Sequence, residues 1–216
     1  MRPEDRRAVI LAAAAGIFAD QGYERASMRE IAAAADVTTP VVYDHFRSKA
    51  DLYGSVVQTL TDDLLDHWAD QPAVTPGERF SRTIDAIFSW IERNEQGWRL
   101  LFGHPPADAA VAGVHHSAQE QASRALTTLF HQLPELNLST ELDRARADEL
   151  LAEAAKSAVN AVAAWWWNNR DVAREHVVRL VSDLLWRGLH EMTRTSTHIP
   201  TEGAVHDATR ESEHCT

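Results

Sequence analysis

The stretch 27–49, SMREIAAAADVTTPVVYDHFRSK, decides the fold, because it predicts two short helices joined by a tight turn. Ser27 and Glu30 stand three positions apart and can satisfy each other's free N–H groups as a capping box, which marks a helix start. The residues that follow form one apolar stripe at helical spacing, made of Met28, Ile31, Ala32 and Ala35. The stripe predicts a helix that packs against the rest of its domain through one face.

The second helix of this stretch is predicted over about 40–46. Asp36 precedes it and is a residue type that tolerates the left-handed backbone of a turn. Thr39 is a candidate cap, and Pro40 suits the first helical position, where a missing N–H costs nothing. Because a helix of about two turns is not stable alone, its neighbours must hold it. The pattern indicates a helix-turn-helix, whose second helix enters the DNA major groove.

The run from Val9 to about Val57 resembles the DNA-binding domain of TetR-family transcriptional regulators. The most specific part of the resemblance is the Tyr-x-His-Phe-x-Ser-Lys motif directly after the helix-turn-helix. The resemblance covers about a quarter of the chain and is carried by Phe18-Ala-Asp-Gln-Gly22-Tyr23, Ser27 to Ala35, Val37, Tyr43-Asp-His45-Phe46, Ser48-Lys49 and Leu52-Tyr53.

The resemblance implies a set of DNA-contacting residues in this head. Three of them start the recognition helix and should meet base edges or phosphates, and the others should meet the DNA backbone; the set is Ser27, Arg29, Thr38, Thr39, Pro40, Tyr43, His45 and Lys49. Val42, Phe46 and Ile31 are expected in the core instead. The chain departs from the family pattern at Asp36, where glycine is common, and at Thr39, where a basic residue is common. Both departures should lower non-specific affinity for DNA.

Charge is unevenly divided along this acidic chain. Residues 1–50 carry seven basic and seven acidic side chains, so residues 51–216 carry the remaining 14 basic and 25 acidic ones and all of the −11 net charge. A neutral head can face DNA while the acidic remainder is held away from it. Because seven basic side chains make few phosphate contacts, a dimer with two heads is expected to bind far better than a monomer.

The rest of the chain has a helical pattern throughout, which predicts an all-α protein of about nine helices. The predicted domains are a three-helix DNA-binding head over 1–50, a helical effector-binding and dimerisation domain over 51–195, and a disordered tail over 196–216. The resemblance implies that a fourth helix joins the head to a five-helix body. It also implies a homodimer that binds a palindromic double-stranded DNA operator, most simply as a repressor, and a small-molecule effector that releases it.

Two further groups of residues are candidates for contacts in the body. A ligand pocket lined by aromatic residues is expected from Trp90, Trp98, Arg99, Phe102, His104 and Trp166, although plain core packing explains each aromatic residue equally well. The resemblance implies that the last two helices of each subunit form the dimer interface, and packing of their apolar stripes inside one subunit is the alternative; the candidate residues are Trp165, Leu184, Leu185, Gly188, Leu189 and Met192. Trp165 to Trp167 are consecutive and cannot share one helix face, so Trp166 is assigned to the core and a neighbour to the partner.

The sequence offers no pattern for catalysis, a cofactor or a metal. His116 and Glu120 could share a metal, but a zinc site needs three or four converging ligands. The single cysteine, Cys215, excludes an internal disulfide, which suits the cytoplasm. Acidic residues in the first turn argue against a signal peptide, and no segment approaches a membrane-spanning length. Two alternatives stay open: a TetR-fold ligand-binding protein or enzyme without DNA binding, and a regulator that activates.

Overall fold

The computed structural model describes residues 2–69, 75–132 and 141–193, with only the backbone path given for 69 and 189–193. Within these ranges the chain forms nine helices and no strands, which confirms the all-α prediction. The helices are α1 (Pro3–Gln21), α2 (Met28–Ala34), α3 (Thr39–His45), α4 (Lys49–Ala69), α5 (Pro76–Arg93), α6 (Glu95–Phe102), α7 (Ala109–His131), α8 (Arg144–Trp167) and α9 (Arg174–Thr193).

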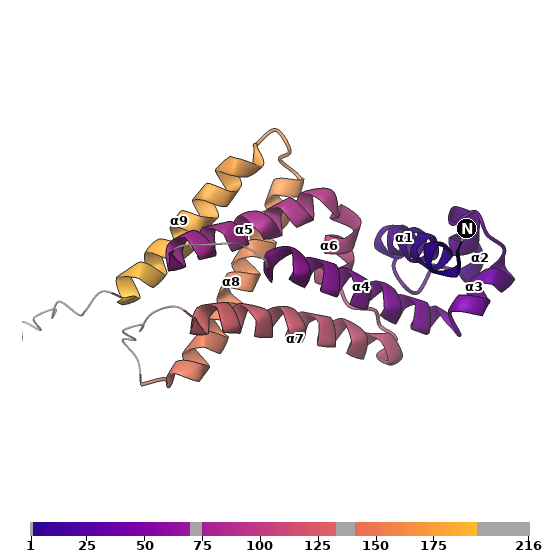
Figure 1. The fold of residues 1–216 in the computed structure, drawn as a ribbon, viewed down its shortest axis with the longest axis horizontal. Helices are drawn as coiled ribbons and strands as arrows, with labels where there is room; N and C mark the ends of the chain where they lie inside the picture. Colours follow the sequence, from indigo (N-terminus) through magenta and orange to yellow (C-terminus); the bar gives the residue numbers. More distant parts are fainter. Residues whose placement is uncertain (1, 70–74, 133–140, 194–216) are drawn as a thin grey trace, which may run out of the picture.

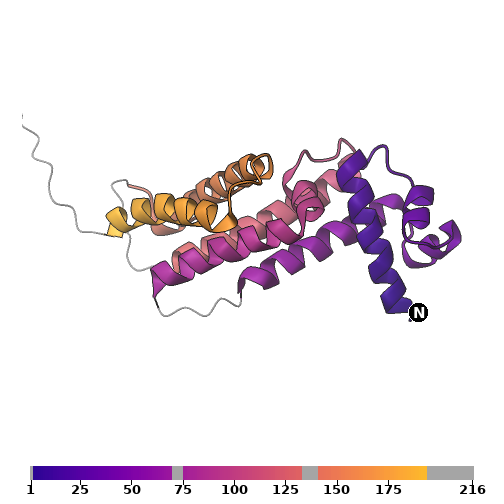
Figure 2. The same ribbon diagram turned by 90° about the horizontal axis from the view of Figure 1, so that it is seen from above.

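The molecule is elongated, with the first three helices gathered at one end (Figure 1). Helix α4 starts in this head and runs into the body, where α5 and α7 lie along it (Figure 2). Helix α6 is short and packs across α1, so that it joins the head to the body. Helices α8 and α9 form a hairpin, with α8 packed on α7 and α9 packed on α5. Helix α4, which runs from the head into the body, is therefore packed between α5 and α7.

Local contacts form the helix ends of the head, and the capping box at Ser27 is the predicted one. Gly22 ends α1 with a φ of 79°, a conformation that glycine adopts without steric cost. Ser27 and Glu30 form the capping box: the Ser27 hydroxyl accepts from the Glu30 N–H, and the Glu30 carboxylate accepts from the Ser27 N–H at 3.1 Å. Ser48 caps α4 by accepting from the Asp51 N–H at 3.1 Å. These contacts join residues no more than three apart, so the sequence alone defines them.

Close packing of α6 depends on a glycine. A Cβ atom on Gly97 would lie 2.8 Å from Leu60, closer than real Cβ atoms approach, and 3.3 Å from the Trp90 ring, which is a tight contact. Trp90 itself is 1% exposed and donates its indole N–H to Asp63 of α4 at 2.6 Å. Gly97 therefore lets α6 pack directly on α4 and α5, so that a movement of either helix would displace α6.

The predicted domain boundaries remain predictions. Helix α4 continues through residues 50 and 51 without a break, and the predicted tail over 196–216 lies outside the described residues. Among the residues that the structure describes, none of the helices combines the length and apolar composition needed to cross a lipid bilayer.

Candidate nucleic-acid interface and ligand cavities

The recognition helix α3 has one buried and one open face. Val42 and Phe46 are 0% and 1% exposed in the core of the head, where α3 packs on α2, and Ile31 of α2 is fully buried. These are the three residues assigned to the core of the head from the sequence. On the opposite face Pro40 is exposed, and Tyr43 is 53% exposed although it is a large aromatic residue. The packing therefore presents α3 outward at one end of the molecule.

The turn before α3 determines which of the first residues of α3 are exposed. Asp36 has a φ of 52°, the left-handed conformation expected there. The helix begins one residue earlier than predicted, so that Thr38 rather than Thr39 is the N-cap and Pro40 is the second helical residue. The Thr38 side chain makes no capping hydrogen bond and is exposed, whereas Thr39 is half-buried. Thr38 thus offers a free hydroxyl at a helix N-terminus, a position that favours anions.

The other predicted DNA-contacting residues differ in how exposed they are and in whether their polar groups already form hydrogen bonds. Arg29 is exposed on α2, but the Ser27 hydroxyl is engaged in the capping box. His45 is half-buried with its ring 6.4 Å from that of Phe46. Arg47, which was counted only as charge in the sequence, is exposed between α3 and α4. Its exposure and its place directly after the Tyr-x-His-Phe motif make it a further candidate for contact with DNA.

Lys49 has a different environment from the one predicted. Its ammonium group donates to three backbone carbonyls of the α1–α2 loop, those of Tyr23 at 2.7 Å, Ala26 at 3.1 Å and Glu24 at 3.2 Å. It also lies 4.3 Å from the centre of the Tyr23 ring. Because an ammonium group has three N–H donors, these carbonyls use all of them. In this structure Lys49 ties the start of α4 to the loop and does not point outward to a phosphate.

An apolar cavity lies inside the body between α4, α5, α6, α7 and α8. Its volume is about 30 Å³, and aliphatic and aromatic side chains form nearly all of its wall: Leu64, Trp68, Phe80, Ile84, Ile87, Ile91, Phe102, Ala122, Leu126, Leu129, Ala155 and Val159. Lys156 and Asn160 are the polar residues at its edge. A second hollow of about 300 Å³ shares Trp68, Leu126 and Leu129 with it and leads toward the surface.

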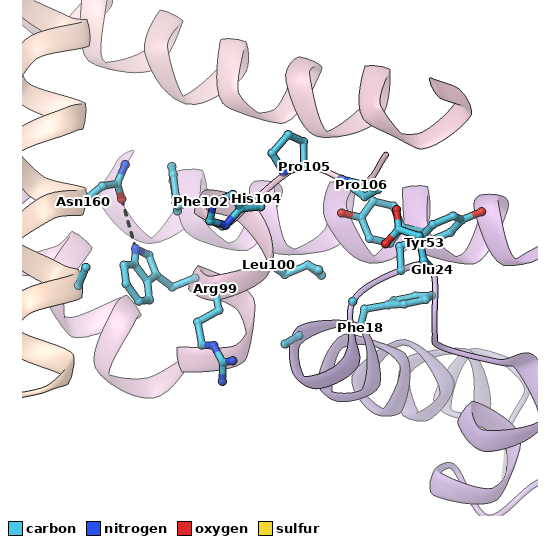
Figure 3. Close-up of a pocket in the computed structure, with 16 residues that line it drawn as sticks. Phe18, Glu24, Tyr53, Arg99, Leu100, Phe102, His104, Pro105, Pro106 and Asn160 are labelled. Carbon is cyan, nitrogen blue, oxygen red and sulfur yellow. Dashed lines mark hydrogen bonds between the residues drawn. The ribbon is translucent and has the colours of Figure 1, made fainter. Parts of the chain in front are cut away.

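A larger cleft of about 500 Å³ lies where the head meets the body (Figure 3). The head supplies the end of α1 and the α1–α2 loop, α4 supplies Tyr53, and the body supplies α6, the α6–α7 loop and two residues of α8. At one end the Trp98 indole donates to the Asn160 side-chain oxygen at 3.2 Å. At the other end Glu24 accepts from the Ala107 N–H at 2.7 Å, which links the head to the α6–α7 loop.

The six residues predicted for one ligand pocket are divided by the fold. Trp98, Arg99, Phe102 and His104 line the head–body cleft, and Phe102 also lines the apolar cavity. Trp90 and Trp166 line neither space. Each is 1% exposed, and Trp166 donates its indole N–H to the Val172 carbonyl at 2.8 Å. Trp166 therefore belongs to the core, as the separate reasoning about the tryptophan run predicted.

The predicted dimer residues lie on a partly open face of the α8–α9 hairpin. Trp165 is 53% exposed and Leu184 67% exposed, while Leu185 is half-buried against the core. Gly188 has no atom within 4 Å of an added Cβ, and the side chains of Leu189 and Met192 lie outside the described residues. Sequence reasoning missed Leu150 and Leu180, which are 61% and 72% exposed on the same two helices.

Metal-binding geometry is lacking in the part of the chain that the structure describes, where no three His, Cys, Asp or Glu side chains converge. His116 and Glu120 do approach each other at 3.0 Å, but both are largely exposed. The pair is an ordinary surface contact between residues one helical turn apart.

Comparison with known proteins gives matches over both parts of the chain. Residues 10–56 match the family model for bacterial regulatory proteins of the tetR family, and residues 64–199 match that for the tetracyclin repressor-like C-terminal domain. The transcriptional activator FasR of Mycolicibacterium smegmatis is 30% identical over 200 residues, which cover 91% of this chain and 85% of FasR. The transcriptional repressor KstR2 of the same organism is 31% identical over 93 residues, or 42% of this chain and 45% of KstR2. A TetR-like regulator from Rhodococcus sp. RHA1 superposes with a TM-score of 0.68 at 25% identity, over 86% of this chain and 96% of that one.

Proposed function

The chain belongs to the TetR family of bacterial transcriptional regulators, and from this premise we propose that it binds a palindromic operator as a homodimer. We propose further that a small, largely apolar or aromatic molecule enters the body and releases the operator. The observation that carries the proposal is the outward face of α3, where Thr38, Pro40 and Tyr43 are exposed on a helix whose other face is buried.

On DNA, the start of α3 enters the major groove. The Thr38 hydroxyl and the Pro40 ring then meet base edges, where hydroxyl and apolar contacts can distinguish bases. Tyr43 directs its phenol to a phosphate, and Arg29, His45 and Arg47 contribute positive charge or hydrogen bonds beside it. Ser27 approaches the same backbone through the N-terminus of α2. Lys49 acts indirectly, by holding the α1–α2 loop to α4.

The dimer forms through the α8–α9 hairpins of two chains. The support for this is the size of the exposed apolar side chains on the hairpin, since a monomer rarely leaves several large ones together in water. Leu150 and Trp165 of α8 and Leu180 and Leu184 of α9 are each more than half exposed. Gly188 has open space above it, which allows a partner helix to approach closely. Two heads would double the phosphate contacts and would match a two-fold symmetric operator.

The effector is placed in the apolar cavity of the body. With a volume of about 30 Å³, this cavity holds little more than one water molecule. A larger ligand must therefore separate the helices around it, among them α4 and α6. Because α4 carries the head and α6 packs on α1, that separation moves the two heads relative to each other. A ligand that fits only the separated form shifts the population toward it and lowers operator affinity.

A repressor is the simplest outcome of this mechanism, because a dimer on its operator obstructs transcription. Activation is the second candidate, and one observation favours it: FasR, the relative matched over most of its length, is named an activator. KstR2 is named a repressor but matches less than half of each chain. The position of the operator relative to the promoter would decide between the two.

The test is selection of genomic fragments by the purified full-length protein, followed by affinity measurements on the selected sequence. Tyr43→Ala should weaken binding to every sequence. If the hydroxyl meets a phosphate, Tyr43→Phe should weaken it as much, by about 1.5–3 kcal/mol, the contribution of one hydrogen bond to a charged group. Thr38→Val should change which sequence is preferred. If Tyr43→Ala weakens binding and Tyr43→Phe does not, the aromatic ring of Tyr43 acts through packing and its hydroxyl meets no phosphate. Absence of any salt-dependent, sequence-selective binding would support the ligand-binding protein or enzyme without DNA binding.

A further inference from the structure

The head–body cleft has features that the proposed effector mechanism does not use. Its walls come from both parts of the chain, so any occupant would touch the head and the body at once. Pro105 and Pro106 lie on one side, with Phe18 and Leu100 on the other (Figure 3). These four apolar side chains leave a space of about 500 Å³ between them and the polar groups at the two ends. This volume is enough for a compact ring between the apolar walls.

The polar groups at the head end of the cleft favour a donor or a cation. Glu24 remains charged, because hydrogen bonds from its own N–H and from Ala107 N–H lower the pKa of its carboxyl group. A carboxylate can accept about four hydrogen bonds, so the N–H groups of Glu24, Ala107 and Asp108 leave room for another. Burial raises the pKa of the neighbouring Tyr53 hydroxyl to about 12, so this group is neutral and can accept as well.

The charges around the cleft point the same way. Arg99 is the cation on its wall, and it already lies 3.8 Å from Asp20 and 3.7 Å from Glu95. Lys49 is bound by three carbonyls. The lining of the cleft contains one carboxylate, Glu24, and one guanidinium, Arg99, whose charge Asp20 and Glu95 offset from outside the lining. The Glu24 carboxylate therefore attracts a cationic ligand and opposes an anionic one.

We propose that the head–body cleft is a second ligand site, separate from the apolar cavity, and that it takes a compact ring bearing a protonated amine. The ring lies between Leu100 and the prolines, and the ammonium group faces Glu24. Asn160 closes the opposite end, where its side-chain oxygen accepts from Trp98. Asn160 and Phe102 line both spaces, so the two sites share a wall and their occupants are coupled.

The coupling gives the cleft a regulatory role. A ligand that contacts Glu24 of the head and also Leu100 and Pro106 of the body stabilises the present orientation of the head. Effector binding in the apolar cavity moves α6, and with it Phe102, against the same ligand. The amine and the effector should therefore oppose each other, each lowering the affinity of the other by the same factor.

The probe is 2-phenylethylamine, with 3-phenylpropanoate as an anion of similar shape, titrated into the full-length protein without DNA. Calorimetry should show millimolar binding of the amine and at least tenfold weaker binding of the anion. Glu24→Gln should weaken amine binding at least fivefold. Ala164→Trp places a large side chain in the cleft from an exposed position on α8 and should abolish binding. Ala110→Trp, on an exposed alanine of α7 outside the cleft lining, is the matched control and should leave binding unchanged.

The proposal is overturned if the amine does not bind, if the anion binds as well, or if Ala164→Trp and Ala110→Trp behave alike. These results leave the proposed function untouched, because the titration contains neither DNA nor effector. Conversely, a protein that failed to select any operator could still bind the amine. Thermal unfolding of each variant identifies loss of binding that comes from loss of the fold.

Discussion

Lys49→Met separates a structural role for this lysine from contact with DNA. Methionine keeps the length of the side chain but removes the three N–H donors and the charge. The carbonyls of Tyr23, Glu24 and Ala26 then lose their bonds of 2.7 to 3.2 Å. A hydrogen bond to a charged group contributes about 1.5–3 kcal/mol when well buried. Because this lysine is only half-buried, we expect the three bonds together to contribute about 2–3 kcal/mol to the stability of the head.

The ring contact adds a smaller amount. The ammonium group lies 4.3 Å from the centre of the Tyr23 ring, and Tyr23 is packed edge to face on Tyr53 at 5.2 Å. An exposed cation–π contact contributes about 0.5–1 kcal/mol. Unfolding of the head should therefore shift to a lower denaturant concentration, and operator affinity should fall because the loop no longer holds α2 and α3 against α4.

The salt dependence of operator binding provides the assay. Fluorescence anisotropy of a labelled operator, measured between about 50 and 200 mM salt, gives a slope of log affinity that falls by about 0.9 for each phosphate that the protein no longer neutralises. Lys49→Met should weaken binding with an unchanged slope, since the ammonium group of this lysine donates to three carbonyls of the head. Arg47→Gln is the control that should lower the slope, because this exposed arginine lies beside α3. A Lys49→Met protein with normal stability and a slope reduced by about 0.9 per head would refute the reasoning.

Other perturbations test separate parts of the structure. Asp36→Gly should leave thermal stability equal or higher, because glycine adopts the observed φ of 52° without the steric cost of about 1 kcal/mol that aspartate has there. The same change should tighten DNA binding, because it removes a negative charge. A loss of thermal stability would contradict the first expectation. Leu180→Glu combined with Leu184→Glu should give a monomer in analytical ultracentrifugation, whereas a dimer that persists would place the interface elsewhere. Burial lowers the pKa of His115, so the unfolded chain takes up a proton first as the pH falls below about 6.5; stability should decrease from there toward the lower folded pKa, and His115→Leu should flatten this decrease in urea unfolding. An unchanged pH dependence in that variant would assign the effect to other groups.

Much of the fold could be predicted because its signals are local. The cap at Ser27, the turn at Asp36 and the end of α1 at Gly22 depend on residues within one helical turn. Apolar spacing assigned Ile31 to the core of the head, and the resemblance assigned Val42 and Phe46 to it; all three are buried. Boundaries were less certain, since α3 begins one residue before the predicted start.

The candidate sites depended more on contacts between distant parts of the chain. Trp90 and Trp98 are eight residues apart, yet one meets Asp63 of α4 in the core and the other meets Asn160 of α8 at the cleft. Spacing along the sequence does not distinguish these environments, because both residues are apolar and helical. The exposed apolar residues of α8 and α9 could not be identified from the sequence for the same reason, because Leu150 and Leu180 resemble core residues until their neighbours are known.

Lys49 shows which features the sequence determines and which features the tertiary structure decides. The stretch 27–49 establishes a helix-turn-helix by itself, because caps, turn conformation and apolar spacing act between near neighbours in the chain. The partners of the lysine are 23 to 26 residues away in sequence, and only the packing of α1 against α4 brings their carbonyls to its ammonium group. A charged side chain forms its strongest contacts with whatever the fold places nearest. Its role is therefore decided by the tertiary structure, even where its presence was plain from the motif.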